Sequence, residues 1–409
     1  MERLTGVIGL LVLLATAWVL SRDRKAIRWD TVLWGLVLQL CFAFFVLKLE
    51  FGQRALAAVA TGVTYLISFA DHGGEFVFGW LGESGPDHYV FAFKVLPIVI
   101  FISSFFTCLY YLGVMQFIVL GMAKIMTRFM GVSGSESLAA AANVFMGQTE
   151  APIVVAPYIP KMTYSELMAL MTGGMATVSG AILGGYIGLG INAEHLIAAS
   201  IMAAPASLVM AKMLIPETEE SLTAGQVRLQ VEKVDANLID AAARGAGQGA
   251  ILAINIAAML IAFISIIYLL NGMLTAAGEF TGLNQYLGTE LTMQWILGSL
   301  LAPLAFLMGV PWHDASDVGQ LIGIKVILNE FIAYADLAQI QDTMDDKSRL
   351  IATFALCGFA NLGSIGIQIG GIGGLAPSRK SDLARLGLRA VLAGSLASFM
   401  TATLAGILD

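Results

Sequence analysis

The chain has 409 residues, of which 58% are hydrophobic and only 12% charged, with a mean hydropathy of +0.81 and a formal net charge of −7. A soluble domain is about 25% charged on average, so this composition excludes an ordinary soluble globule and a disordered chain, and the negative charge argues against a nucleic-acid partner. It predicts an all-α polytopic membrane protein, with room for about eight to eleven spans of about 20 residues each.

Eight apolar runs are long enough to be transmembrane helices. The first has no clear signal-peptide cleavage site and is followed by four basic residues at 22–28, so we expect it to be a retained span. A less apolar stretch at 51–70 is predicted to lie in the membrane interface. The eight runs are 4–20, 31–48, 91–117, 163–190, 194–215, 248–271, 350–375 and 386–408.

Two further segments, 131–160 and 309–340, are apolar but interrupted by glycine, proline and carboxylates. Each opens on a Gly-Val pair and reaches a glutamate, Glu150 or Glu330, 19 or 21 residues later, and each is followed by a glycine-rich span. This repeat predicts two re-entrant hairpins that enter from opposite sides, as in secondary transporters built from inverted repeats. Charge counting leaves one alternative open, in which 292–308 and 312–340 each cross the membrane.

The predicted organisation has four parts, of which two form a transport domain. They are 1–130 (N-terminal spans, interfacial helices and scaffold), 131–215 (first repeat of the transport domain), 216–308 (cytoplasmic linker, scaffold span and external helix) and 309–409 (second repeat of the transport domain).

The distribution of basic residues predicts the orientation. With the N-terminus outside, 15 of the 22 Lys and Arg residues fall in inside segments, and the outside loops at 49–90 and 272–291 hold mostly acids. We therefore expect a multi-pass protein of the bacterial inner membrane with both termini in the periplasm.

Metal and thiol chemistry have little support in the sequence. The three cysteines form no CxxC pair and the four histidines form no HExxH motif. The run Trp312-His313-Asp314 is expected to start a helix with Asp314 as its cap, and no catalytic residue is predicted.

Glu150 follows Gln148 and Thr149, between a glycine and a proline that interrupt helix geometry. A carboxylate deep in the bilayer costs about 2.5–3.5 kcal/mol, so it is kept where it faces a polar cavity or a partner. An amide, a hydroxyl and a carboxylate within three residues suit the edge of a planar heterocycle. The alternative is a structural pair between Glu150 and Lys161.

Glu330 follows Asn329, and a carboxylate beside an amide is suited to the paired hydroxyls of a sugar. Lys325 lies five positions earlier, which is not an i, i+4 spacing. The alternative is a structural contact between Lys325 and Glu330 across a broken helix.

Polar residues also interrupt the apolar spans. Asn361 and Ser364 are three apart and are expected to share a helix face, although composition alone favours a role in joining helices. Phe359 either stacks on a base or simply packs, and packing is favoured. Asn143 and Thr177 offer oxygen ligands for a small cation, and a polar contact between helices explains them equally well.

Three long motifs occur in order along the chain: GQTEAP at 147–152, GxKxxxNEFxAY at 323–334 and CGFANxxSIGI at 357–367. On these motifs the chain resembles the concentrative nucleoside transporters, in their bacterial sodium-coupled branch, over essentially its whole length. Shorter matches lie at 216–219, 304–312 and 374–377.

The resemblance implies a homotrimer whose transport domain moves as an elevator and carries a nucleoside such as uridine, cytidine or adenosine, with sodium as coupling ion and no other cofactor. It implies eight transmembrane helices plus the two hairpins. By resemblance, Gln148, Thr149 and Glu150 contact the base, Ile182 and Phe359 line its apolar faces, Glu330, Asn361 and Ser364 hold the ribose, and the side chains of Asn143 and Thr177 with the carbonyls of Met146 and Val178 bind sodium.

The chain departs from the family pattern at three of these positions. Thr177 stands where serine is expected but keeps the hydroxyl, Met146 replaces a smaller residue, and Ile182 replaces the usual valine and narrows the space for large bases. The ending of the GQTEAP motif favours sodium over protons.

Other functions remain open at this point. A proton-coupled nucleoside symporter is one alternative, and a transporter of another polar solute is a second. An intramembrane hydrolase that uses Glu150 and Glu330 as an acid/base pair would form product without a gradient. A channel would conduct without saturation, and the inverted repeat argues against it.

Overall fold

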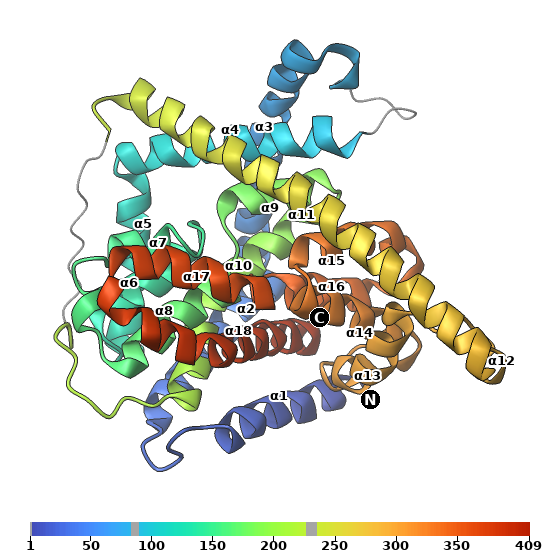
Figure 1. Ribbon diagram of the computed structural model, residues 1–409. Helices are drawn as coiled ribbons and strands as arrows, with labels where there is room; N and C mark the ends of the chain where they lie inside the picture. The colour runs from blue at the N-terminus through green and yellow to red at the C-terminus, as the bar shows by residue number, and fades with distance from the viewer. Residues whose placement is uncertain (1, 83–89, 226–234) are drawn as a thin grey trace.

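The computed structural model describes residues 2–82, 90–225 and 235–409, and every regular element in these ranges is a helix (Figure 1). The described ranges leave out part of the loop at 49–90 that was predicted to face the periplasm. They also leave out Arg228 and Lys233, two of the 15 basic residues assigned to inside segments.

Helices α1 and α2 agree with the predicted runs, and the interfacial stretch extends further than expected. The predicted run 91–117 is wrong at its end, because α4 stops at Tyr111 and a separate helix that was not predicted, α5, follows. One side of α3 is buried along its length, from Gly52 through Leu56 and Ala60 to Ile67 and Ala70, at the spacing of an amphipathic helix. These helices are α1 (Glu2–Val19), α2 (Trp29–Lys48), α3 (Glu50–Phe78), α4 (Phe91–Tyr111) and α5 (Val114–Met130).

Seven helices in the described ranges are long and apolar enough to cross a membrane, or eight if a bent pair counts as one. By this measure α3, predicted to lie in the interface, is long enough to span. Helix α1, predicted to span, is too short, because its apolar part is only Leu4–Val19. The other predicted spans all qualify except the one at 350–375, which the structure breaks into two short helices.

The first hairpin begins at a capping box, in which the Ser133 hydroxyl accepts from the Glu136 amide and the Glu136 carboxylate accepts from the Ser133 amide. Helix α6 (Gly134–Asn143) then ends far short of the next helix, because residues 144–150 leave the helical path before α7 (Ala151–Val154). The predicted span that follows is also broken. It consists of α8 (Tyr164–Ala176) and α9 (Gly180–Gly188), and α10 (Ala193–Leu214) comes next.

Helix α11 (Leu238–Thr281) crosses the whole molecule diagonally and packs along α4 (Figure 1). Its 44 residues correspond to about 66 Å, twice the thickness of a bilayer core of about 30 Å, so it is longer than the predicted 248–271 at both ends. Short α12 (Leu283–Leu287) follows it.

The second hairpin resolves the alternative that charge counting left open. Helix α13 (Met293–Leu307) and helix α14 (Trp312–Ile327) meet at an angle of 115°, so they do not form two spans in sequence. Helix α14 ends at Leu328, and α15 (Glu330–Ile340) starts at once with Asn329 as its N-cap. The region is therefore a sharply bent helix pair followed by a second break, which agrees with the hairpin predicted from the repeat.

The last predicted span is broken into α16 (Asp346–Leu356) and α17 (Leu362–Leu375), and α18 (Lys380–Leu408) ends the chain. Helix α18 packs against α8 and α10 and against both halves of the last broken span, α16 and α17 (Figure 1).

Two local predictions are wrong. Asp314 lies inside the first turn of α14 and accepts from the Asp345 amide, while the N-cap is Pro311, which has no capping side chain. Asn361 does not share a helix face with Ser364, because it is the N-cap of α17 and its side chain accepts from the Ser364 amide at 2.9 Å.

Candidate functional site

The breaks in the two spans lie against each other. The Phe359 amide, which would otherwise continue α16, donates to the Thr177 carbonyl at 3.2 Å. Gly358 has a φ of +149°, and a Cβ on it would lie 2.9 Å from the carbonyl oxygens of Met175 and Ala176. Only glycine permits this close crossing of two unwound segments.

Four of the predicted substrate residues form one chain of hydrogen bonds across this crossing. The Glu330 carboxylate accepts from Asn361 Nδ2 at 3.1 Å, and Asn361 Oδ1 in turn accepts from the Ser364 amide. The Ser364 hydroxyl accepts from Gln148 Nε2 at 3.1 Å. The second hairpin, the second broken span and the first hairpin are thereby joined, and all four side chains are buried.

Two residues that sequence reasoning missed complete this chain. The Tyr186 hydroxyl donates to Glu330 Oε1 at 3.1 Å, and Gln368 Nε2 donates to Gln148 Oε1 at 3.2 Å. Each lies four positions after a predicted residue on the same helix, Tyr186 after Ile182 and Gln368 after Ser364. The i, i+4 spacing was therefore a signal that could have found both.

Glu150 and Thr149 lie outside this network. Glu150 is partly buried and accepts only from the Gly147 amide, at 3.3 Å, among the interactions described for its side chain, and Thr149 is exposed. The alternative pair with Lys161 does not form. Arg244, on α11, attracts Glu150 only from a distance, because its guanidinium is paired with Asp235.

The two apolar site residues differ in exposure. Ile182 is buried and Phe359 is half-buried. Phe359 lies in the unwound segment between α16 and α17, and its amide is held by the Thr177 carbonyl. It packs against the buried hydrophobic core.

The predicted cation ligands surround the same crossing and leave oxygen atoms without partners. Asn143 is completely buried and its Oδ1 has no hydrogen-bond donor, while its Nδ2 donates to the Ala139 carbonyl. The Met146 and Val178 carbonyls accept no hydrogen bond that the structure describes, whereas the Val144 and Phe145 carbonyls beside Met146 do.

Thr177 Oγ1 donates to the Gly173 carbonyl and keeps its lone pairs. A buried oxygen without a donor is costly. A set of amide, hydroxyl and carbonyl oxygens is the chemistry of a hard cation site, so these residues fit sodium.

Lys325 is not the partner of Glu330. Its side chain is completely buried, and its Nζ donates to the Ala355 carbonyl at 2.8 Å. The alternative explanation of Glu330 as one half of an ion pair is therefore wrong.

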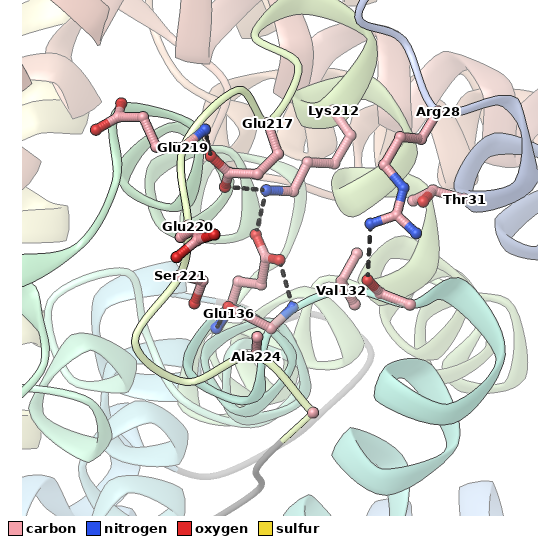
Figure 2. Close-up of a pocket in the computed structure, with 13 residues that line it drawn as sticks. Arg28, Thr31, Val132, Glu136, Lys212, Glu217, Glu219, Glu220, Ser221 and Ala224 are labelled. Atoms are coloured by element: carbon pink, nitrogen blue, oxygen red, sulfur yellow. Dashed lines mark hydrogen bonds and ion pairs between the residues drawn. The ribbon is translucent and has the colours of Figure 1, made fainter.

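A cavity of about 420 Å³ lies at the base of the first hairpin, away from these residues (Figure 2). Figure 2 shows Lys212 between two carboxylates, Glu136 at 2.7 Å and Glu217 at 3.3 Å. The same Lys212 also donates to Ser165. This network anchors the base of the hairpin, and none of the predicted substrate or sodium ligands lines the cavity.

The fold and this arrangement define a class of protein, a helical membrane transporter in which two opposed hairpins meet two broken helices. Three family models together span most of the chain: Na+ dependent nucleoside transporter N-terminus (8–81), Nucleoside recognition (92–193) and Na+ dependent nucleoside transporter C-terminus (195–406). The chain belongs to the family of sodium-dependent nucleoside transporters, which are transporters and not enzymes.

Relatives and solved structures agree. An uncharacterized transporter of Haemophilus influenzae is 45% identical over all of this chain and 98% of its own length. Sodium/nucleoside cotransporter 1 of Mus musculus is 40% identical over all of this chain and 64% of its own length. The structure of CNTnw in an inward-facing substrate-bound state is 43% identical and has a TM-score of 0.92 over 99% of this chain and 98% of that one.

Proposed function

We propose that the protein is a symporter that imports nucleosides, such as uridine, cytidine and adenosine, driven by a sodium gradient. The observation that carries the proposal is the chain of hydrogen bonds from Glu330 through Asn361 and Ser364 to Gln148. It brings a buried carboxylate of the second hairpin together with one amide of the second broken span and one of the first hairpin. Polar groups of this kind inside a membrane are retained for a polar ligand.

In this proposal Glu330, Asn361 and Ser364 hold the ribose hydroxyls, because a carboxylate and an amide accept and donate in pairs. Gln148, Thr149 and Glu150 take the edge of the base, and Ile182 and Phe359 lie against its faces. When the nucleoside binds, Gln148 and Ser364 exchange their mutual hydrogen bond for bonds to it.

Sodium binds to the side chains of Asn143 and Thr177 and to the carbonyls of Met146 and Val178. These four oxygens come from the end of α6 and the break between α8 and α9. A bound cation joins the tip of the first hairpin to the broken span. It therefore orders the part of the site that contacts the nucleobase before the nucleoside binds. Ligand and ion each favour the loaded state, which couples their movements.

The transport domain, 131–215 with 309–409, moves as an elevator against a scaffold that includes 1–130 and 216–308, in a homotrimer in the bacterial inner membrane with both termini in the periplasm. The long α11 supports this division, because it packs along α4 rather than among the hairpins.

The test is counterflow of labelled uridine in proteoliposomes, with sodium, with potassium and with a proton gradient alone. We expect saturable exchange that requires sodium. Exchange driven equally by protons in the absence of sodium would support the proton-coupled alternative, and conductance without saturation would indicate a channel.

A further inference from the structure

Lys325 is a buried cation that forms no ion pair among the described residues, although the charge of Glu330 attracts it from a distance. It lies on α14, the first arm of the second hairpin, with none of its surface exposed. Among the described residues no carboxylate lies within 4.0 Å of its Nζ, which lies over the Phe399 ring, 5.9 Å from the ring centroid. The other buried lysine, Lys212, instead has Glu136 and Glu217. Burying an ammonium that forms no ion pair is costly, so its position calls for a functional explanation.

The group that Lys325 binds is a helix end. Ala355 lies in the last turn of α16, and its carbonyl would normally accept from the amide of Phe359 four residues later. That amide donates instead to Thr177, across the crossing of the two broken spans. The break therefore leaves the Ala355 carbonyl open, and Lys325 Nζ supplies the missing donor at 2.8 Å. A positive charge is also favourable at a helix C-terminus.

The same contact connects the two sides of the ribose site. The segment that follows α16 ends at Asn361, which donates to Glu330. Glu330 lies on the second hairpin, five residues after Lys325. The hairpin and the broken span are thus joined at two points, Lys325 to Ala355 and Glu330 to Asn361, with a short unwound segment on each side.

We propose that Lys325 is a positioning residue for ribose recognition. By closing the open end of α16 against the second hairpin, it sets the spacing between Glu330 and Asn361, so that both meet the hydroxyls of one sugar. It does not touch the nucleoside. This inference rests on the proposed role of Glu330 and Asn361 at the ribose.

The experiment measures competition against labelled uridine in proteoliposomes for Lys325→Met, which keeps the length of the side chain and removes charge and donors. Two ratios of inhibition constants are measured. The first, 3′-deoxyuridine over uridine, reports recognition of the ribose, and the second, adenosine over uridine, reports recognition of the base. We expect the first ratio to fall at least fivefold and the second to stay within twofold of the wild-type value. An unchanged first ratio would overturn the proposal.

Lys212→Met is the matched control, because it also removes a buried lysine but leaves the second hairpin intact. It is expected to lower the melting temperature without changing either ratio, so a fall of the ribose ratio in both variants would show a general effect of destabilisation and overturn the proposal. Lys325→Gln is the second variant if Lys325→Met does not fold. Its side chain is one atom shorter and uncharged, so it should hold the Ala355 carbonyl less well and the ribose ratio should fall here too; an unchanged ratio would overturn the proposal.

Glu330→Gln separates the inference from the function on which it rests. If it lowers the ribose ratio and Lys325→Met does not, the positioning role is wrong and the ribose site stands. If Glu330→Gln leaves the ratio unchanged, the assignment of the ribose site itself is wrong.

Discussion

The two hairpins carry equivalent glutamates in different surroundings. In the second hairpin only two residues separate α14 from α15, and Glu330 is buried with two side-chain donors, Tyr186 and Asn361. In the first hairpin seven residues separate α6 from α7, and Glu150 is partly exposed with one backbone donor, the Gly147 amide.

The difference indicates that the two hairpins recognise different parts of the nucleoside in the proposed site. A carboxylate whose hydrogen bonds are already made is pre-organised, and this suits a part of the ligand that does not vary between nucleosides, the ribose. An unwound loop with free polar groups can adapt, which suits a base that differs from one nucleoside to another. The cation ligands lie on the adaptable side, where ordering by an ion has the larger effect.

The largest expected effect is that of Glu330→Gln. The substitution removes the negative charge that accepts two hydrogen bonds, each worth about 1.5–3 kcal/mol. Uptake should therefore fall by more than about 100-fold, and by a similar factor for every nucleoside. Initial rates and apparent affinities in proteoliposomes measure this. Glu330→Ala should abolish saturable uptake, and normal transport by either folded variant would remove Glu330 from the site.

Glu150→Gln should have a smaller effect that depends on the base. Glu150 makes one described hydrogen bond, so we expect uptake to fall about tenfold, which corresponds to about 1–1.5 kcal/mol. The fold-reduction should differ between uridine and adenosine. Competition assays with both nucleosides give the two factors. Equal losses for both, as large as those of Glu330→Gln, would contradict the division between the hairpins.

Asn143→Ala tests the cation ligands on the first hairpin. It removes the buried oxygen that lacks a donor, so the sodium concentration for half-maximal uptake should rise about tenfold, which corresponds to about 1.4 kcal/mol. Thr177→Ser is the matched control, because it keeps the hydroxyl and should leave sodium dependence unchanged. Unaltered sodium dependence in Asn143→Ala would place the ion elsewhere.

The smallest effect concerns the helix starts at the bases of the hairpins. Ser133 caps α6 through its side chain, whereas α14 has Pro311 and no capping side chain. Ser133→Ala should therefore destabilise the protein by about 1 kcal/mol and lower the melting temperature in detergent, with sodium-driven uptake retained. Pro311→Ala should change the melting temperature less, and a larger shift there would show that the second hairpin depends on its entry residue more than its capping suggests.

Several features followed from the sequence alone, because they depend on composition and on local backbone preferences. The apolar runs and the low charge identified the spans, and glycine, proline and a glutamate inside an apolar run identified both hairpins. The motifs around Glu150 and Glu330 were also visible, because a buried carboxylate has characteristic neighbours.

Tertiary structure decided which polar groups meet. Asn361 was expected on a helix face and is instead a helix cap, and Lys325 was weighed as a partner of Glu330 and instead binds the end of α16. Tyr186 and Gln368 gained their roles only because α9 and α17 lie against the hairpins. Spacing along one helix determines which residues share a face, but contacts between broken helices depend on where each chain segment leaves the helical path, and that is settled by packing across the molecule.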